Sequence, residues 1–281
     1  MEDCQSQVAD LKKLRAISYL APNSFDFYQA VVAYAGRILG VATQLHQGEC
    51  DPLQDPLLIE NQVDLLFICG LPLIRYCRHV PSQLQVLVAP VMKATRYQNQ
   101  PIYFSDVIVN AASGLTRFED LAFKSFCYND LGSNSGYNLL CDRLIQTGHS
   151  KNFFSQAIQS GSHQRSIEWV VNGRVDCAAI DSVVLERELQ QFPELSHQLR
   201  VVEVLGPSPM PPLVVAQRLG TASIEQLQFA LLQPDTELQS VMEEVGVRRF
   251  TVVELKEYEG LAESFSSRDK EFLSTRSNKT L

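Results

Sequence analysis

The chain has 281 residues, of which 45% are hydrophobic, and it carries a formal net charge of −8. This length allows one large domain or two ordinary ones with a sizeable core. Because the charges form no long single-sign run, and phosphate backbones need clustered Lys and Arg, we expect no nucleic-acid partner. Any anion that this protein binds must therefore be held by local groups.

The N-terminal stretch MEDCQSQVADLKKLRA lacks the basic and apolar segments of a secretion signal. No later window has the length of a membrane span. On this sequence we expect a cytoplasmic protein, the alternative being a periplasmic or lipid-anchored one, with Cys4 as the anchor, if the true start lies upstream. The seven cysteines show no CxxC spacing and indicate neither a disulfide framework nor a zinc site. We expect no metal and no cofactor.

Strand and helix patterns alternate from the beginning of the chain. Residues 14–22 read as a buried strand, and Ser24 is placed to cap a helix that Gly40 would end. Three further strands are predicted over residues 41–45, 63–70 and 84–92. The predicted strand over 63–70 leads through Gly70 and Pro72 into a helix. This alternation is typical of a mainly parallel α/β sheet.

A second set of elements follows from residue 102. It comprises strands over 102–110, 124–129 and 175–181 and helices over 137–147 and 163–172, with two later strands at 199–206 and 212–219 and two later helices at 224–233 and 237–246. The extended stretches 99–105 and 204–212 could carry the chain to a second lobe and back. We therefore predict lobe I from residues 1–103 plus 207–257, lobe II from 104–206, and a polar C-terminal tail over 258–281.

The segment YNDLGSNSGYN, residues 128–138, predicts a strand, a tight loop and then a helix. The first backbone N–H groups of a helix have no internal partner, so together with Ser133 and Ser135 they could form an anion site. The alternative is that one of these serines only caps the helix. The segment has no P-loop lysine, and Asn134 stands where a nucleophile elbow needs serine.

Two more polar residues lie at predicted element ends. His163 follows a plausible cap, Ser162, at the start of a helix, and could donate a hydrogen bond to the same anion. Asp181 ends a strand at the edge where α/β sheets bind ligands, or else caps the next helix. A serine, His163 and Asp181 in this chain order match none of the familiar catalytic triads.

Taken in order, several motifs resemble the phosphate, phosphite and phosphonate substrate-binding proteins of ABC transporters. The likeness runs from residue 14 to about 250 and rests on YFSDVIV, LTRFEDL, FCYNDLGSNSGYN, GSHQRSIEWVVNGRVDCAAIDS and GPSPMPPLVV. It implies a two-lobed type II periplasmic-binding-protein fold with two hinge crossovers and an interlobe cleft that holds a small oxyanion. It also implies an ABC permease as partner and no catalytic residue.

Matched residue by residue, the resemblance implies a set of ligand-binding positions. These are Ser133, Asn134, Ser135 and Gly136 in the turn, Tyr103 at the start of a strand, His163, and Asp181; the lobe I loops near Asn23 and Gly70 are expected to complete the site.

The chain also departs from the family pattern. Asp130-Leu131 replaces an Asp-Pro, and the segments ECDPLQDP and PSPMPP lack the tyrosine and the acid that aminophosphonate binders use. Two other hypotheses are a cytosolic enzyme on the same fold, with His163 and Asp181 as acid and base, and an intracellular ligand sensor.

Overall fold

The computed structural model describes residues 13–149 and 152–266. Within them the chain forms two compact units. Unit 1 contains residues 13–102 and 209–260, and unit 2 contains residues 103–208 and continues from 261. The chain thus passes between the units at 102/103, at 208/209 and at 260/261.

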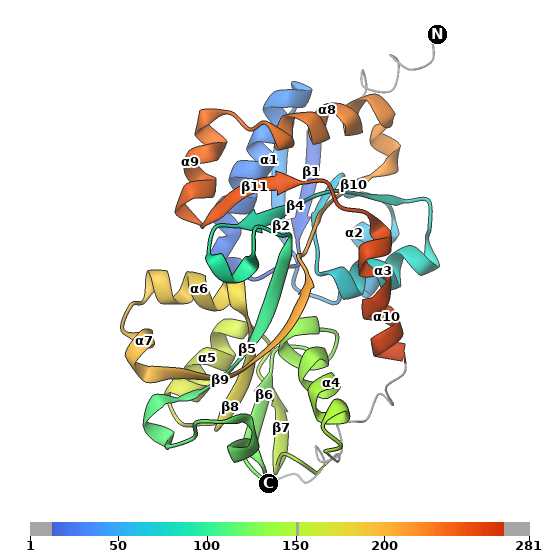
Figure 1. Ribbon diagram of the computed structural model, residues 1–281. Helices are drawn as coiled ribbons and strands as arrows, with labels where there is room; N and C mark the ends of the chain where they lie inside the picture. The colour runs from blue at the N-terminus through green and yellow to red at the C-terminus, as the bar shows by residue number, and fades with distance from the viewer. Residues whose placement is uncertain (1–12, 150–151, 267–281) are drawn as a thin grey trace. The chain divides into compact units, whose positions relative to one another are not determined.

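The described part of unit 1 is built on a six-stranded sheet in the order β11-β4-β10-β3-β1-β2 (Figure 1). Its strands are β1 (Lys13–Ser18), β2 (Ala42–Gln47), β3 (Leu65–Phe67), β4 (Leu84–Met92), β10 (Leu213–Ala216) and β11 (Val247–Thr251). The helices of this unit are α1 (Phe25–Leu39), α2 (Pro56–Ile59), α3 (Gly70–His79), α8 (Thr221–Leu232) and α9 (Thr236–Glu244).

The prediction of a mainly parallel sheet is wrong for unit 1. Strand β1 pairs in parallel with β2 and β3, but β10 is antiparallel to both of its neighbours, and β11 is antiparallel to β4. The reason is topological: β10 enters after the chain returns from unit 2 and inserts between β3 and β4. Local strand and helix patterns do not reveal such a long-range insertion.

Helix α1 shows how the local sequence shapes unit 1. Tyr28, Val31, Val32 and Ala35 are buried along one face, as their helical spacing predicts. Gly40 ends the helix with a φ of 69°, a left-handed conformation that suits a residue without Cβ. Ser24 precedes the helix, but its side chain makes no capping hydrogen bond, so that detail of the prediction is wrong.

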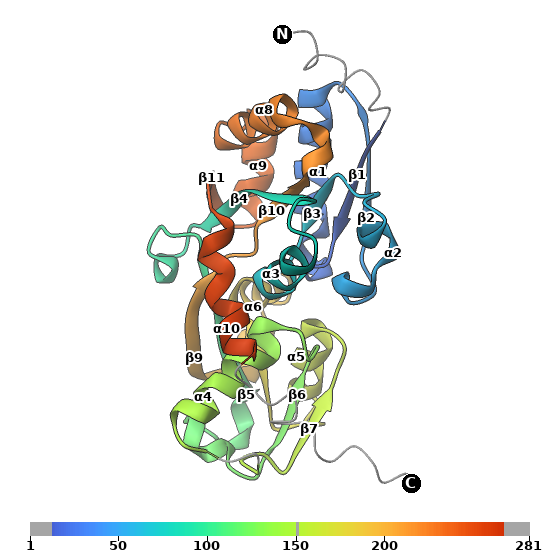
Figure 2. The same cartoon turned by 90° about the vertical axis from the view of Figure 1, so that its right-hand side faces the viewer.

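Unit 2 contains a five-stranded sheet in the order β7-β6-β8-β5-β9, whose strands are labelled in Figure 1 and seen from another side in Figure 2. Its strands are β5 (Ile102–Asn110), β6 (Ser125–Tyr128), β7 (Gln156–Gln159), β8 (Cys177–Asp181) and β9 (Leu199–Pro209). The helices of this unit are α4 (Leu139–Gln146), α5 (His163–Val171), α6 (Ser182–Gln191) and α7 (Leu195–Gln198). The two late strands predicted on either side of PSPMPP therefore belong to different sheets.

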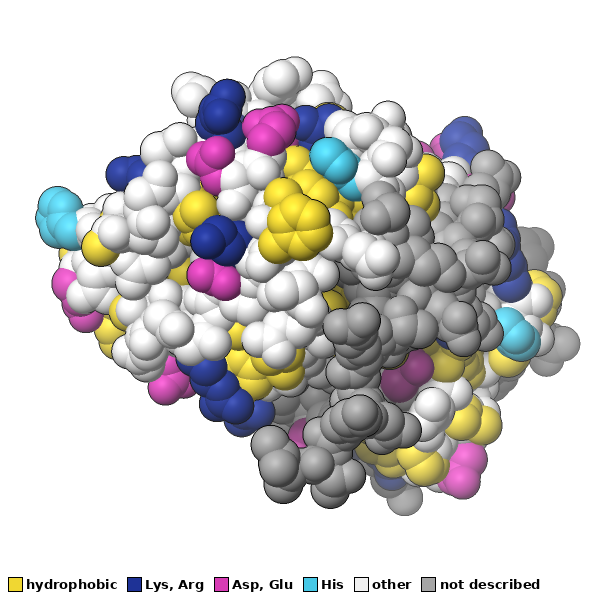
Figure 3. Space-filling model, turned by 90° about the horizontal axis from the view of Figure 1, so that it is seen from below, with side chains coloured by type: hydrophobic (Ala, Val, Ile, Leu, Met, Phe, Trp, Pro, Cys, Tyr) yellow, Lys and Arg dark blue, Asp and Glu magenta, His cyan; other side chains and the backbone are white. Residues whose placement is uncertain are grey.

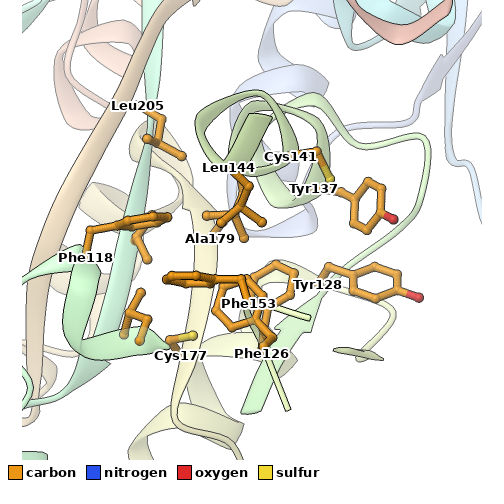
Figure 4. Close-up of a cluster of buried hydrophobic side chains, with 14 of the residues drawn as sticks. Phe118, Phe126, Tyr128, Tyr137, Cys141, Leu144, Phe153, Cys177, Ala179 and Leu205 are labelled. Carbon is orange, nitrogen blue, oxygen red and sulfur yellow. The ribbon is translucent and has the colours of Figure 1, made fainter. Parts of the chain in front are cut away.

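One hydrophobic cluster supports α4 from below. Figure 4 shows aromatic side chains of β6 and neighbouring loops packed beneath the helix, with Cys141 and Leu144 of α4 among them. The Phe126 and Phe154 rings lie 4.9 Å apart between centroids, and Tyr128 and Tyr137 lie equally close. Because Tyr137 belongs to the segment before α4, this packing fixes the start of the helix against the end of β6.

Part of the predicted tail is ordered. Residues Glu259–Ser266 form helix α10, after a 3-10 turn over Leu255–Tyr258 whose Tyr258 is fully buried. The Tyr258 hydroxyl donates a hydrogen bond to the Met210 carbonyl at 2.8 Å. The tail prediction is therefore wrong up to residue 266, because an aromatic anchor holds the segment, and its remainder lies outside the described residues.

Candidate functional site

The loop between β6 and α4 begins its helix with a widened turn. Asn134–Asn138 form a π-helical turn, in which the Asn138 N–H donates to the Ser133 carbonyl at 3.1 Å. The Ser133 hydroxyl accepts from the Gly136 N–H at 3.0 Å and so caps the turn. Ser133 thus fills the capping role weighed above, while π turns are frequent at functional sites.

Gly136 allows the turn to lie directly against the preceding strand end. A Cβ placed on this residue would collide with the Asn129 side-chain oxygen and crowd the Ser133 hydroxyl. A side chain at this position would therefore force the Asn129 side chain to move, and glycine avoids that collision. This explains physically why the matched position carries no side chain.

Ser135 and His163 are 28 residues apart in sequence, and their side chains meet. The Ser135 Oγ lies 3.3 Å from the His163 Nε2, and the two residues are 3% and 7% exposed. Backbone bonds hold their loops together: the Gly161 N–H donates to the Asn129 carbonyl at 3.1 Å. Two predicted ligand positions are thus in contact within unit 2.

The protonation of His163 determines what Ser135 can do. Burial lowers the pKa of His163 to about 4, so the imidazole is neutral at pH 7. Its Nδ1 is buried and has no hydrogen-bond partner among the described residues. An unpaired buried N–H is rarer than an unpaired acceptor, so the ring proton belongs on Nε2, pointing to Ser135. Ser135 then accepts from His163 and keeps its own proton to donate.

The Asn134 side chain joins two other hydroxyls. Its Nδ2 lies 2.8 Å from the Tyr103 hydroxyl and 2.8 Å from the Ser208 Oγ. All three residues are buried, with exposures of 3%, 1% and 2%. Sequence reasoning missed Ser208, although a hydroxyl inside the proline-rich PSPMPP was the available signal.

Two residues of neighbouring strands complete the cluster. The Ser105 hydroxyl donates to the Ser135 carbonyl at 2.7 Å, and Ser105 stands opposite Asp181 in the β5–β8 register. The Asp181 Oδ1 accepts from the Val183 N–H at 2.8 Å, so this carboxylate caps α6. Burial raises the pKa of Asp181 to about 7, and the nearby Asp106 carboxylate raises it further. The capping N–H groups act in the opposite direction and lower this pKa.

The two remaining predicted positions belong to unit 1. Asn23 lies in the 3-10 turn Pro22–Ser24 that follows β1, and Gly70 is the first residue of α3. The structure therefore brings Tyr103, Asn134, Ser135 and His163 together in unit 2, with Ser133, Gly136 and Asp181 on adjoining backbone. We call the side chains of Tyr103, Asn134, Ser135, His163 and Ser208 the hydroxyl cluster.

Polar groups at the corresponding strand ends of unit 1 bind their own chain. The Tyr19 hydroxyl donates to Asp55 at 2.9 Å, and burial together with this carboxylate raises the pKa of Tyr19. The Gln47 amide donates to the carbonyls of Ser18 and Leu20 at 2.9 and 3.0 Å. These bonds close loops of unit 1.

Three observations concern other kinds of site. On the face drawn in Figure 3, side chains of Lys and Arg are interspersed with those of Asp and Glu. Among the residues that the structure describes, no group of three His, Cys, Asp or Glu side chains could hold a metal ion. None of the described helices has the length and apolarity needed to cross a bilayer.

Comparison with known proteins gives a family for this arrangement. Residues 17–258 match the model of a family described as "ABC transporter, phosphonate, periplasmic substrate-binding protein". A sequence search of curated proteins finds no match.

Solved structures are similar over nearly the whole chain. PhnD1 from Prochlorococcus marinus, in complex with methylphosphonate, has a TM-score of 0.79 at 18% identity, covering 92% of this chain and 98% of its own. A binding-protein component of an ABC phosphonate transporter from Pseudomonas aeruginosa has a TM-score of 0.77 at 16% identity, covering 90% and 85%. The alkanesulfonate-binding protein SsuA from Xanthomonas axonopodis pv. citri, bound to MOPS, has a TM-score of 0.62 at 17% identity, covering 94% and 95%. Likeness at these identities shows the fold and confirms the predicted α/β type II periplasmic-binding fold.

Proposed function

Because the chain belongs to the phosphonate-binding periplasmic substrate-binding proteins of ABC transporters, we propose that the hydroxyl cluster of unit 2 binds a small phosphonate-like oxyanion. One observation carries this proposal. The Ser135 hydroxyl is buried at the start of a widened helical turn, with its Oγ 3.3 Å from the His163 Nε2. With the ring proton assigned to Nε2 as above, the Ser135 proton remains to be donated.

The proposed mode of binding uses hydrogen bonds from neutral groups and backbone. At the start of the π-helical turn Asn134–Asn138 and of α4, N–H groups and the helix dipole favour negative charge. A hydrogen bond to a charged group contributes about 1.5 to 3 kcal/mol, so four or five reach the roughly 8 kcal/mol of micromolar affinity before ordering costs. The assembled donors therefore suffice for capture without a lysine or arginine clamp.

We further propose that this chain binds and releases its ligand without chemistry. An activated serine needs a base that is itself oriented by a third group. His163 contacts Ser135, but its Nδ1 has no hydrogen-bond partner among the described residues. One carboxylate oxygen of Asp181 already accepts a hydrogen bond at the start of α6. This geometry gives no support to the enzyme hypothesis.

The family also suggests a partner and a compartment. Its members are described as periplasmic substrate-binding proteins of ABC transporters. We propose that this chain works in the same compartment and delivers its ligand to an ABC permease. Cell fractionation tests the compartment, and co-purification with a permease tests the partner.

Isothermal titration tests the ligand. We expect methylphosphonate, phosphite or phosphate to bind wild-type protein, and Ser135→Ala to weaken that binding by about 10- to 100-fold through the loss of a hydrogen bond to a charged group. Ser166→Ala is the matched control, since Ser166 is a fully buried serine of unit 2 bonded to the Ser160 hydroxyl. No heat and no thermal shift with any of these anions would contradict the proposal.

A further inference from the structure

The Asn134 side chain is turned toward other side chains of the cluster. Its Nδ2 has two protons, and the two acceptors at 2.8 Å are the Tyr103 and Ser208 hydroxyl oxygens. Both protons are therefore used inside the protein. This arrangement makes Asn134 a residue that orients hydroxyl groups.

Ser208 is left with a proton that points elsewhere. A hydroxyl that accepts from Asn134 cannot direct its own proton back to the same nitrogen. Ser208 is 2% exposed, and its Oγ has no second hydrogen-bond partner within the described residues. A buried O–H without an acceptor is costly. The site therefore lacks one acceptor, which a bound ligand would supply.

We infer that Ser208 is a ligand-binding residue that donates to the oxyanion, and that Asn134 is the positioning residue that makes it a donor. The inference rests on the proposed function and refines it, because the ligand oxygen at Ser208 must be one that accepts a proton. The Tyr103 hydroxyl oxygen also accepts from Asn134. A phosphonate oxygen without a proton meets this requirement.

The opposite amide orientation has a different consequence. The amide oxygen and nitrogen of asparagine are told apart by their partners. If Oδ1 faced Tyr103 and Ser208, both hydroxyls would donate to Asn134 and Ser208 would have no proton for a ligand. Removal of the Ser208 hydroxyl distinguishes these two arrangements.

The first experiment is isothermal titration of methylphosphonate into wild type, Ser208→Ala and the control Ser166→Ala, with thermal unfolding of each variant. We expect Ser208→Ala to bind about 10- to 100-fold more weakly and the control to bind as wild type. Wild-type affinity in a folded Ser208→Ala overturns this inference and leaves the proposed function intact. If wild-type protein binds none of methylphosphonate, phosphite and phosphate, the proposed function is overturned and this inference with it.

The second experiment isolates the positioning role of Asn134. In the wild-type background Asn134→Ala should weaken methylphosphonate binding by at least tenfold. In a Tyr103→Phe/Ser208→Ala background it should change the affinity less than about twofold, because no hydroxyl remains for it to orient. An equal loss in both backgrounds would show that Asn134 acts through the shape of the turn, and the positioning role would be wrong.

Discussion

The strand ends of the two units use similar polar residues in different ways. In unit 1, Tyr19 and Gln47 donate their protons to a carboxylate and to backbone carbonyls of the same unit. In unit 2, the Ser208 oxygen accepts a hydrogen bond from Asn134, and with the ring proton of His163 assigned to Nε2 the Ser135 oxygen accepts one from His163. Hydroxyls that donate inward close a fold, whereas hydroxyls that accept inward keep a proton for a ligand. On the proposed function, the direction of these hydrogen bonds separates the structural strand ends of unit 1 from the proposed binding strand ends of unit 2.

The largest effect that we expect is a pH-dependent change in the free energy of unfolding, and it comes from His163 in unit 2. Its pKa is about 4 in the folded protein and about 6.5 when unfolded, so between these values the unfolded chain binds more protons. The contribution of His163 to the free energy of unfolding is therefore complete above pH 6.5. About 3 kcal/mol of that contribution is lost as the pH falls toward 4. In the same window Asp181 acts in the opposite sense, since the pKa of Asp181 is raised to about 7. His163→Gln should remove the first contribution.

Urea unfolding at pH 7 and pH 4 checks this expectation. The difference between wild type and His163→Gln should shift by about 3 kcal/mol across the window, in favour of the variant at low pH. Because Asp181 is present in both proteins, its contribution cancels in the comparison. His197→Gln, at an exposed position of unit 2, serves as the control. Parallel pH profiles for wild type and His163→Gln would refute the buried neutral imidazole.

The next effect concerns the turn that gives unit 2 its binding geometry. Gly136→Ala places a Cβ against Asn129 and Ser133, and overpacking of this kind costs about 1 to 3 kcal/mol. We expect a lower thermal midpoint together with weaker methylphosphonate binding. Gly260→Ala is the matched control, because nothing lies within 4 Å of its Cβ position. Unchanged stability and affinity in Gly136→Ala would argue that the turn has no required shape.

The smallest effect addresses unit 1. Tyr19→Phe removes the hydrogen bond to Asp55 and should lower the free energy of unfolding by about 1 kcal/mol. Because this hydroxyl serves the fold, methylphosphonate affinity should stay at the wild-type value in calorimetric titration. A tenfold loss of affinity with unchanged stability would remove the contrast between the units.

Local elements of the fold were largely predictable from the sequence. The strands 84–92 and 102–110 have the predicted bounds, and Gly40 ends α1, because alternation, amphipathic spacing and glycine act over a few residues. The insertion of β10 between β3 and β4 was not predictable in this way, since strand order depends on contacts far apart in the chain. Helix α10 was missed because the polar composition after residue 258 concealed the anchoring role of Tyr258.

In the candidate site, too, local features were predictable from the sequence and long-range contacts were not. A cap by Ser133 or Ser135 was expected from the sequence, and the structure gives that role to Ser133. Asp181 as a cap was expected as one of two roles. The contact of Ser135 with His163, and the bond from Asn134 to Ser208, join residues 28 and 74 positions apart. A propensity argument carries no information about such pairs. The resemblance supplied several of these positions, but the hydroxyl orientations come from the structure.

The widened turn and the neutral imidazole have one joint consequence for how such a site works. The donors gathered in unit 2 are hydroxyls and backbone N–H groups, and the imidazole beside them is neutral because its pKa is about 4. Ionic strength screens interactions between full charges far more than short hydrogen bonds in a buried site. An oxyanion held in this way should keep its affinity as salinity changes, so its capture would vary little between dilute and saline surroundings.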